Sequence, residues 1–137
     1  MHGLHLTADL HRCRRGGPGP SLFTDPAALE ALCRGQVAAA GLQAVAALFH
    51  RFEPSPGASG PAGVTGVVLL AESHLAVHTW PELDAVTLDV YVCNFGRDNT
   101  EAAGRLMDAL VAAFAPAQVE RHGLPRGRPL PLPLPTP

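Results

Sequence analysis

Three strand-like segments follow one another in the middle of the chain, and this succession limits the possible folds more than any other feature. They span residues 64–71, 74–80 and 85–93 and are rich in valine, leucine and threonine. Strands that lie so close in the sequence usually pair as neighbours. The succession therefore predicts a largely antiparallel sheet.

The alternation of residue types within the last two segments predicts that this sheet has two unlike faces. Successive side chains of a strand point to opposite sides. One side collects the aliphatic residues Leu75, Val77, Val86, Leu88, Val90 and Val92. The other side carries His74, Ala76, His78, Trp80, Thr87, Asp89, Tyr91 and Cys93. We expect the aliphatic face to pack on helices and the second face to meet water, a ligand or another subunit.

Two helices and three more strands complete the predicted fold. A first helix begins at Pro26, because Thr24 and Asp25 offer a capping side chain before a proline at the first helical position, and it ends at Gly41. A second helix is expected over about residues 98–114, where apolar residues recur at helical spacing. Further strands are expected over residues 3–9, 43–52 and 117–122. The order β-α-β-β-β-β-α-β favours a largely antiparallel sheet with both helices on one face.

Glycine and proline mark the segments that we expect to lie outside the packed layers. Residues 13–21 form a loop rich in Gly, Pro and Arg, and residues 53–63 (EPSPGASGPAG) form a mobile surface loop. From residue 123 onward, a proline-rich sequence predicts a disordered or polyproline tail. We therefore predict one domain over residues 1–122, followed by a tail over residues 123–137.

The composition excludes several classes of protein. Hydrophobic residues make up 47% of the 137 residues and charged residues 16%, which excludes wholesale disorder and a coiled coil. The net charge of −2 gives no sign of a nucleic-acid or membrane-surface partner. No apolar run reaches the roughly 18–20 residues of a membrane span and no signal peptide is recognisable, so we expect a cytoplasmic protein. All 10 basic residues are arginine, which excludes a Schiff base on lysine.

Residues 72–93 hold the densest group of chemically active side chains, and the residues by themselves leave its role open. His74, His78 and Cys93 suggest a metal site, but residues i and i+4 of a strand lie about 13 Å apart, too far to share one zinc ion easily. Ser73 or Cys93 beside a histidine is compatible with a nucleophile pair. Histidines that merely complete the hydrogen bonding of a sheet face are a third interpretation. Cys13 and Cys33 are expected to be inert cytosolic thiols rather than partners in disulfides.

The sequence of this group resembles the self-cleavage site of the S-adenosylmethionine decarboxylase proenzymes, in their short bacterial and archaeal form. The resemblance rests on ESHLAVHTWPE at residues 72–82, and it extends to FHRF at 49–52 and GVTGVV at 63–68. In all it covers about residues 3–122. The long, ordered run at 72–82 makes the resemblance highly specific.

The resemblance implies that the chain cuts itself between Glu72 and Ser73. The Ser73 hydroxyl would attack the Glu72 carbonyl and convert the peptide bond into an ester. Loss of the Ser73 α-proton would then release Glu72 as a carboxylate, and hydration with loss of ammonia would leave a pyruvoyl group. This self-generated cofactor would form a Schiff base with the substrate amine and act as the electron sink, which is consistent with the absence of lysine. No metal is implied.

Roles for four more residues follow from the same resemblance. His78 matches the histidine that assists processing, as the base of the elimination step. Thr65 stands where the family usually has a serine that assists processing. Cys93 matches the cysteine that protonates the substrate α-carbon after decarboxylation, and a thiol is largely protonated near neutral pH. His5 matches a recurrent family position to which we assign no role.

The expected substrate is S-adenosylmethionine, with spermidine synthesis as the destination of the product. Phe52 and Trp80 are candidate stacking partners for the adenine, and Glu82 is a candidate acceptor for the ribose hydroxyls. Some relatives of this fold act on L-ornithine or L-arginine instead, for which Glu82, Asp84 or Asp89 could each serve as the recognition group. An unprocessed regulatory homologue is a third alternative. The resemblance also implies an α/β (α+β) fold, a two-layer sandwich. Two copies of it would pair sheet to sheet as an αββα homodimer, with two active sites near the interface.

Overall fold

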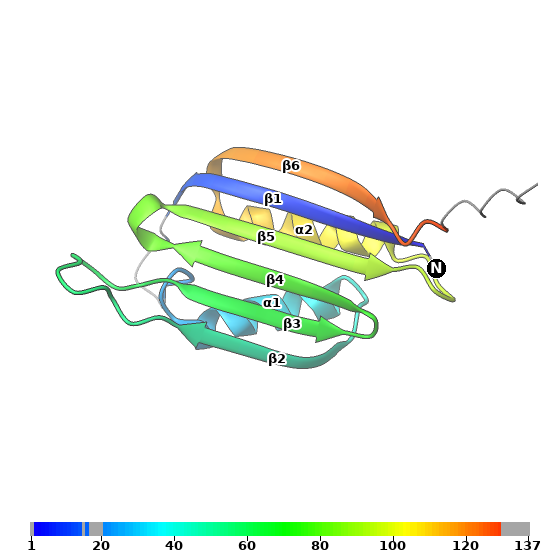
Figure 1. Cartoon of the computed structure of the whole chain (residues 1–137), viewed down its shortest axis with the longest axis horizontal. Coiled ribbons are helices and arrows are strands. Elements are labelled where there is room, and N and C mark those ends of the chain that lie inside the picture. Colours follow the sequence, from blue (N-terminus) through cyan, green and yellow to red (C-terminus); the bar gives the residue numbers. More distant parts are fainter. Residues whose placement is uncertain (1, 15, 17–20, 130–137) are drawn as a thin grey trace, which may run out of the picture.

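The computed structural model describes residues 2–14, 16 and 21–129, which form one sheet and two helices (Figure 1). The strands are β1 (Gly3–Cys13), β2 (Ala44–Arg51), β3 (Val64–Leu70), β4 (Ser73–Trp80), β5 (Ala85–Cys93) and β6 (Pro116–Arg126). The helices are α1 (Pro26–Ala39), α2 (Thr100–Phe114) and the short 3-10 helix η1 (Pro81–Leu83). The predicted order of strands and longer helices is confirmed. Among the described residues, no helix is long and apolar enough to cross a membrane.

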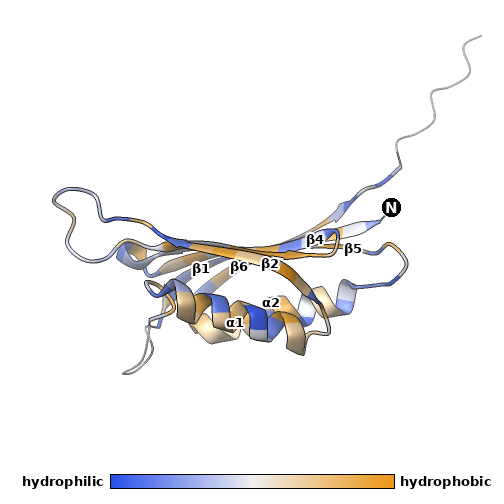
Figure 2. Cartoon of the chain, turned by 90° about the horizontal axis from the view of Figure 1, so that it is seen from below, coloured by the Kyte–Doolittle hydropathy of each residue, from blue (hydrophilic) through white to orange (hydrophobic). Residues whose placement is uncertain are grey.

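The sheet has the strand order β2-β3-β4-β5-β1-β6, and its described neighbours are all antiparallel. Strands β2 to β5 follow one another as a meander, as their succession in the sequence predicts. Both longer helices lie against one face of the sheet, and the other face has no helix over it (Figure 2). The chain is therefore the predicted two-layer sandwich.

Helix α1 begins where its capping residues predict. The Asp25 carboxylate accepts hydrogen bonds from the backbone N–H groups of Ala27 and Ala28, and Pro26 occupies the first turn. Its buried stripe consists of Leu29, Cys33 and Val37. Helix α2 begins at Thr100 rather than at residue 98, because the side chain of Asp98 accepts the N–H of Thr100 and so lies before the first turn.

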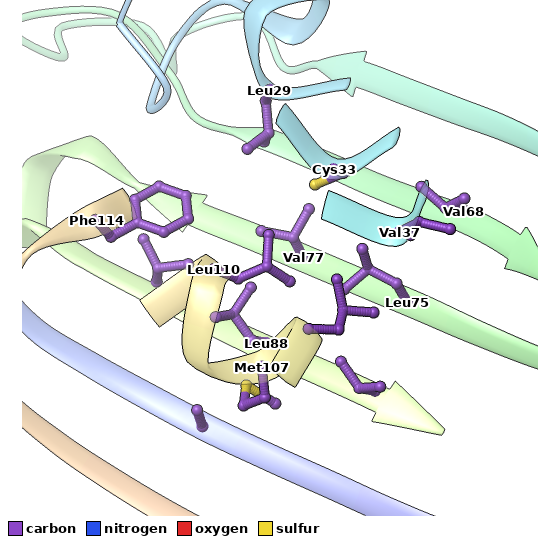
Figure 3. Packing of buried hydrophobic residues seen from close by; sticks show 14 of the residues in the cluster. Leu29, Cys33, Val37, Val68, Leu75, Val77, Leu88, Met107, Leu110 and Phe114 are labelled. Atoms are coloured by element: carbon purple, nitrogen blue, oxygen red, sulfur yellow. The ribbon is translucent and has the colours of Figure 1, made fainter. Parts of the chain in front are cut away.

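The core lies between these helices and the aliphatic face of the sheet (Figure 3). Leu75 and Val77 of β4 and the aliphatic residues of β5 are almost completely buried, as the alternation predicts. Leu106, Met107, Leu110 and Phe114 of α2 pack against them. The two faces of the sheet are therefore settled by the pattern of residue types, and the polar-aromatic face is the one left open.

Two strands extend beyond the predicted boundaries. Strand β1 continues to Cys13, and β6 continues to Arg126, so residues 123–126 are paired sheet residues and the predicted start of the tail at residue 123 is wrong. The reason is mutual pairing, because β6 finds a partner along nearly the whole of β1. Pro125 is tolerated because β6 is an edge strand. The remainder of the predicted tail, residues 130–137, lies outside the described residues, as do residues 15 and 17–20 of the predicted loop.

The buried thiol of Cys33 makes the stability of the fold depend on pH. Burial, and to a smaller extent the Glu30 carboxylate, raises the pKa of this thiol from 9.0 to about 12. Between these two values the unfolded chain releases the proton and the folded chain keeps it, so the free energy of unfolding falls as the pH rises. We expect a contribution of about −1.4 kcal/mol per pH unit to this slope. Urea denaturation at several pH values above 9.0 measures it, and Cys33→Ala should show a shallower slope; an equal slope in both proteins contradicts the prediction.

Thr79 ties three segments together from within the core. Its hydroxyl accepts the N–H of Val64 at 2.8 Å and donates to the carbonyl of Phe23 at 2.8 Å, while the residue is 5% exposed. Thr79→Val keeps the shape but removes the hydroxyl that bonds to Val64 and Phe23, so we expect it to destabilise the protein by about 2–4 kcal/mol. Thr79→Ser, which retains the hydroxyl, is the matched control. Urea denaturation of both variants checks this, and equal stabilities of the two would disprove the assignment.

Candidate active site

The open face of the sheet carries the predicted polar and aromatic residues. On β4, His74, Ala76, His78 and Trp80 are partly exposed, whereas the intervening Leu75, Val77 and Thr79 are buried. On β5, Thr87, Asp89 and Tyr91 are likewise partly exposed. Within the described residues, no group of three or more His, Cys, Asp or Glu side chains is arranged to hold a metal ion.

The predicted cleavage bond lies at an unusual point of the backbone. Only Ala71 and Glu72 connect β3 to β4, and Leu70 pairs directly with Ser73. Glu72 has a φ of 56°, in the left-handed region that residues with a side chain normally avoid. This conformation costs about 1–2 kcal/mol. The bond between Glu72 and Ser73 is therefore presented at the tip of a strained, partly exposed turn.

Ser73 and Cys93 meet at this end of the sheet. The backbone N–H of Cys93 donates a hydrogen bond to the Ser73 hydroxyl oxygen, with a distance of 3.0 Å. Cys93 itself is 6% exposed, at the end of β5. The two residues to which the resemblance assigns the pyruvoyl group and the proton donor are thus neighbours within one chain.

Cys13 and Cys33 lie elsewhere, in the hydrophobic core. Burial is the main cause that raises the pKa of each thiol, with a smaller effect of Asp84 on Cys13 and of Glu30 on Cys33. A raised pKa keeps a thiol protonated and unreactive near neutral pH. Both positions fit the prediction of inert thiols, and all three cysteines of the chain are free.

Thr65 and His78 form a second pair, on β3 and β4. They are register partners, and the Thr65 hydroxyl oxygen lies 3.1 Å from Nδ1 of His78, within hydrogen-bonding distance. The two residues to which the resemblance assigns a role in processing are therefore direct neighbours on the open face. The methyl group that distinguishes threonine from serine does not prevent this contact.

A cavity of about 570 Å³ opens beside the Thr65–His78 pair. Phe52, Trp80 and Glu82, the three predicted substrate-binding residues, line it together with that pair and with the surface loop of residues 53–63. The loop ends at Gly63, where a Cβ atom would overlap the carbonyl oxygen of Thr79. Two aromatic faces and a carboxylate thus border one space of the size that small-molecule sites usually have.

The two groups of predicted site residues lie at opposite ends of the sheet. Ser73 begins β4, whereas His78 lies five positions further along the same strand. At about 3.3 Å per residue, their Cα atoms are roughly 16 Å apart. Within one chain, Ser73 lies beside Cys93, and the Thr65–His78 pair lies beside the cavity. The fold of one chain does not bring these two groups into contact.

Sequence reasoning missed a cluster of side chains beside Ser73. His5 donates from Nε2 to Asp89 at 2.9 Å, the ring of His74 lies against Tyr91, and Arg126 covers Tyr91. Alternation placed His74, Asp89 and Tyr91 on one face, but the pairing of β1 with β5 and β6 could not be derived from the sequence. Arg126 was expected in the tail.

Comparisons with known proteins agree with the geometry. The family model of S-adenosylmethionine decarboxylase matches residues 4–127. The S-adenosylmethionine decarboxylase proenzymes of Hydrogenobaculum sp. (strain Y04AAS1) and Aquifex aeolicus are each 34% identical over 125 residues, which is 91% of this chain and 81% of theirs. The crystal structure of the adenosylmethionine decarboxylase from Aquifex aeolicus matches with a TM-score of 0.76 at 30% identity, covering 93% of this chain and 92% of that one. This chain belongs to the S-adenosylmethionine decarboxylase family, a family of enzymes.

Proposed function

We propose that this protein is a self-processing, pyruvoyl-dependent decarboxylase of S-adenosylmethionine, whose product serves spermidine synthesis. The observation that carries the proposal is the strained turn at Glu72, with the Ser73 hydroxyl and Cys93 directly beside it. Membership of the family and the cavity lined by Phe52, Trp80 and Glu82 support it.

Self-cleavage needs a nucleophile and a base from the chain. Ser73 provides the oxygen that forms a bond to the Glu72 carbonyl carbon as the carbon–nitrogen bond breaks, which gives an ester. A base then removes the Ser73 α-proton, and the oxygen leaves with Glu72 as part of its carboxylate. Water adds and ammonia leaves, so that residue 73 ends as a ketone. His78, hydrogen-bonded to Thr65, is our candidate for the base.

The separation of Ser73 from His78 leads us to place them in one site through a second copy of the chain. If two open faces pack together about a two-fold axis with their strands running in opposite directions, the Ser73 end of one chain meets the His78 end of the other. The open face also bears apolar side chains, since Leu48 is 71% and Leu69 48% exposed. Their removal from water would favour this pairing. Each site of the homodimer would then combine Ser73 and Cys93 of one chain with Thr65, His78 and the cavity of its partner.

The pyruvoyl group would supply a ketone that condenses with the substrate amine and draws electrons from the carbon that loses CO₂. The chain's own residues do the rest. Cys93 lies beside residue 73, since its main-chain N–H donates to the Ser73 hydroxyl oxygen of the uncut chain at 3.0 Å, and its thiol is our candidate for delivering a proton to the substrate α-carbon. Its burial keeps bulk water away from this step.

The cavity favours S-adenosylmethionine over ornithine or arginine. The rings of Phe52 and Trp80 offer faces for an adenine and for a sulfonium, and the Glu82 carboxylate can accept both ribose hydroxyls. Asp89, a possible recognition group for an ammonium, instead accepts a hydrogen bond from His5 and takes no part in lining this cavity.

The test combines the intact mass of the purified protein with CO₂ release from S-adenosylmethionine, ornithine and arginine. We expect two chains, residues 1–72 and 73–137, with the second carrying a pyruvoyl group, and CO₂ from S-adenosylmethionine alone. Ser73→Ala should remain one full-length chain without activity, and Glu82→Gln should be cleaved but should raise KM. A wild-type chain that stays whole and shows no carbonyl reactivity would refute self-processing. Turnover of ornithine or arginine without that of S-adenosylmethionine would refute the substrate.

A further inference from the structure

Five side chains on the open face lie together beside residue 73 and have no part in the chemistry proposed above. They are His5, His74, Asp89, Tyr91 and Arg126. They come from β1, β4, β5 and β6, so the cluster spans four adjacent strands at the end where the chain is cut. His74 is the residue that directly follows the new chain end.

The contact nearest the cut is the one between the rings of His74 and Tyr91. The two residues are register partners on β4 and β5, their ring centroids are 5.5 Å apart, and the ring planes are tilted by 35°. Cross-strand ring pairs of this kind hold two strands in register. This pair acts at the first position of β4 after residue 73.

Tyr91 is held from its other sides as well. Its ring covers Gly3, where a Cβ atom would lie 3.1 Å from ring atoms, and the guanidinium of Arg126 lies over the ring at 5.5 Å from its centroid. His5 meets both rings edge-on, with centroids 6.2 Å from Tyr91 and 6.5 Å from His74.

Both ring nitrogens of His5 have hydrogen-bonding partners, whereas the contacts of His74 in the described part of the chain are ring contacts. Nε2 of His5 donates to Asp89 at 2.9 Å, and Nδ1 accepts from Arg126 at 3.4 Å. Within the described part of the chain, no hydrogen bond ends on the ring nitrogens of His74. Stacking is therefore the interaction by which His74 acts, and another flat ring should replace it.

Self-cleavage would remove two of the restraints that hold residue 73 in the uncut chain. The covalent link to β3 through Ala71 and Glu72 is broken. The hydrogen bond from the Cys93 N–H to the Ser73 oxygen is also lost, because that oxygen leaves with Glu72. What remains is the pairing of β4 with β3 and β5 and the peptide bond to His74, whose ring stacks on Tyr91.

We propose that the His74–Tyr91 stack, braced by His5, Asp89 and Arg126, is the positioning device that keeps the pyruvoyl end beside Cys93 after the chain has been cut. The inference rests on the proposed self-processing. His74 and Tyr91 are positioning residues here, because they act through residue 73 and not on the substrate.

The experiment compares His74→Ala with His74→Phe, each in the cleavable chain and in an uncleavable Ser73→Ala background. Amide hydrogen exchange over residues 74–77 is the readout that needs no activity. We expect exchange to be about tenfold faster in cleaved His74→Ala than in the cleaved wild type, but unchanged between the two uncleaved proteins. Cleaved His74→Ala should lose about 10²-fold in kcat with little change in KM, because the cavity residues are untouched. His74→Phe should restore slow exchange and most of the turnover.

Each other outcome would overturn the inference. If cleaved His74→Ala exchanges its amide hydrogens as slowly as the cleaved wild type, the stack does not restrain the new chain end. If the exchange is accelerated equally in the uncleaved background, the stack makes only an ordinary contribution to strand stability. Failure of His74→Phe to restore exchange shows that stacking is not the interaction, and loss of the dimer in sedimentation shows a role in assembly. Failure of the proposed function is distinguishable, because the wild type itself would then stay uncut by intact mass or release no CO₂.

Discussion

Hybrid dimers of a Ser73→Ala chain and a His78→Ala chain are expected to cut all of their His78→Ala chains, although neither variant cuts itself alone. The reason is the distance of roughly 16 Å along β4 that separates Ser73 from His78 within one chain. In the hybrid, the intact Ser73 of one chain meets the intact His78 of the other. The second site of the same hybrid contains both substitutions and stays inactive.

The two chains are co-expressed with different affinity tags, and the hybrid is purified by two affinity steps, one for each tag. The intact mass of each tagged chain then reports which one has been cut. In hybrids the Ser73→Ala chain should stay whole, and in the His78→Ala homodimer the reaction should stop before elimination, where hydroxylamine cleaves an accumulated ester.

A mirror-image hybrid makes the result unambiguous. Wild-type chains paired with the double variant Ser73→Ala/His78→Ala should stay uncut, because the intact Ser73 then faces a partner without His78. If His78 acted within its own chain, the wild-type chain of this hybrid would be cut and the His78→Ala chain of the first hybrid would not. That pair of results would refute the shared site while leaving self-processing intact.

Cys93→Ala is expected to be cleaved and to carry the pyruvoyl group, yet to lose about 10²–10⁴-fold in kcat. The thiol is assigned to protonation of the substrate α-carbon, which comes after both cofactor formation and CO₂ loss. Cleavage should persist because the contact of Cys93 with Ser73 is made by the main-chain N–H, which alanine retains. Intact mass and CO₂ release measure the two effects separately.

Cys13→Ala is the matched control for this prediction. Cys13 is also a buried thiol, 6% exposed like Cys93, but it lies in the hydrophobic core away from Ser73. It should therefore keep its turnover while it loses some stability. A Cys93→Ala enzyme with the kcat of the wild type would disprove the role of the thiol, and an equal loss in both variants would point to packing instead.

The sequence was sufficient for the elements and for the two faces of the sheet, because both depend on local pattern. Alternation on β4 and β5 separated Leu75 and Val77 from His74 and His78, and burial follows that division. Asp25 and Pro26 set the start of α1 through hydrogen bonds to residues only two and three positions away. Such signals act within a few residues and need no knowledge of the rest of the chain.

The run ESHLAVHTWPE was also sufficient to identify the family, because a long motif with a fixed order of residues is highly specific. It placed the expected cut in a tight link between two strands, where the structure has the positive φ of Glu72. Ser73 and His78 are far apart in one chain because both lie on the single extended strand β4.

Only the tertiary structure decided which distant segments meet. The pairing of β1 with β5 and β6 extends the sheet to Arg126 and assembles His5, Asp89, Tyr91 and Arg126 beside Ser73. No local pattern encodes this, because the order and register of strands far apart in the sequence depend on the free energy of packing the whole sheet against its two helices. The same packing leaves one face open, with Ser73 and Cys93 at one end and the Thr65–His78 pair at the other.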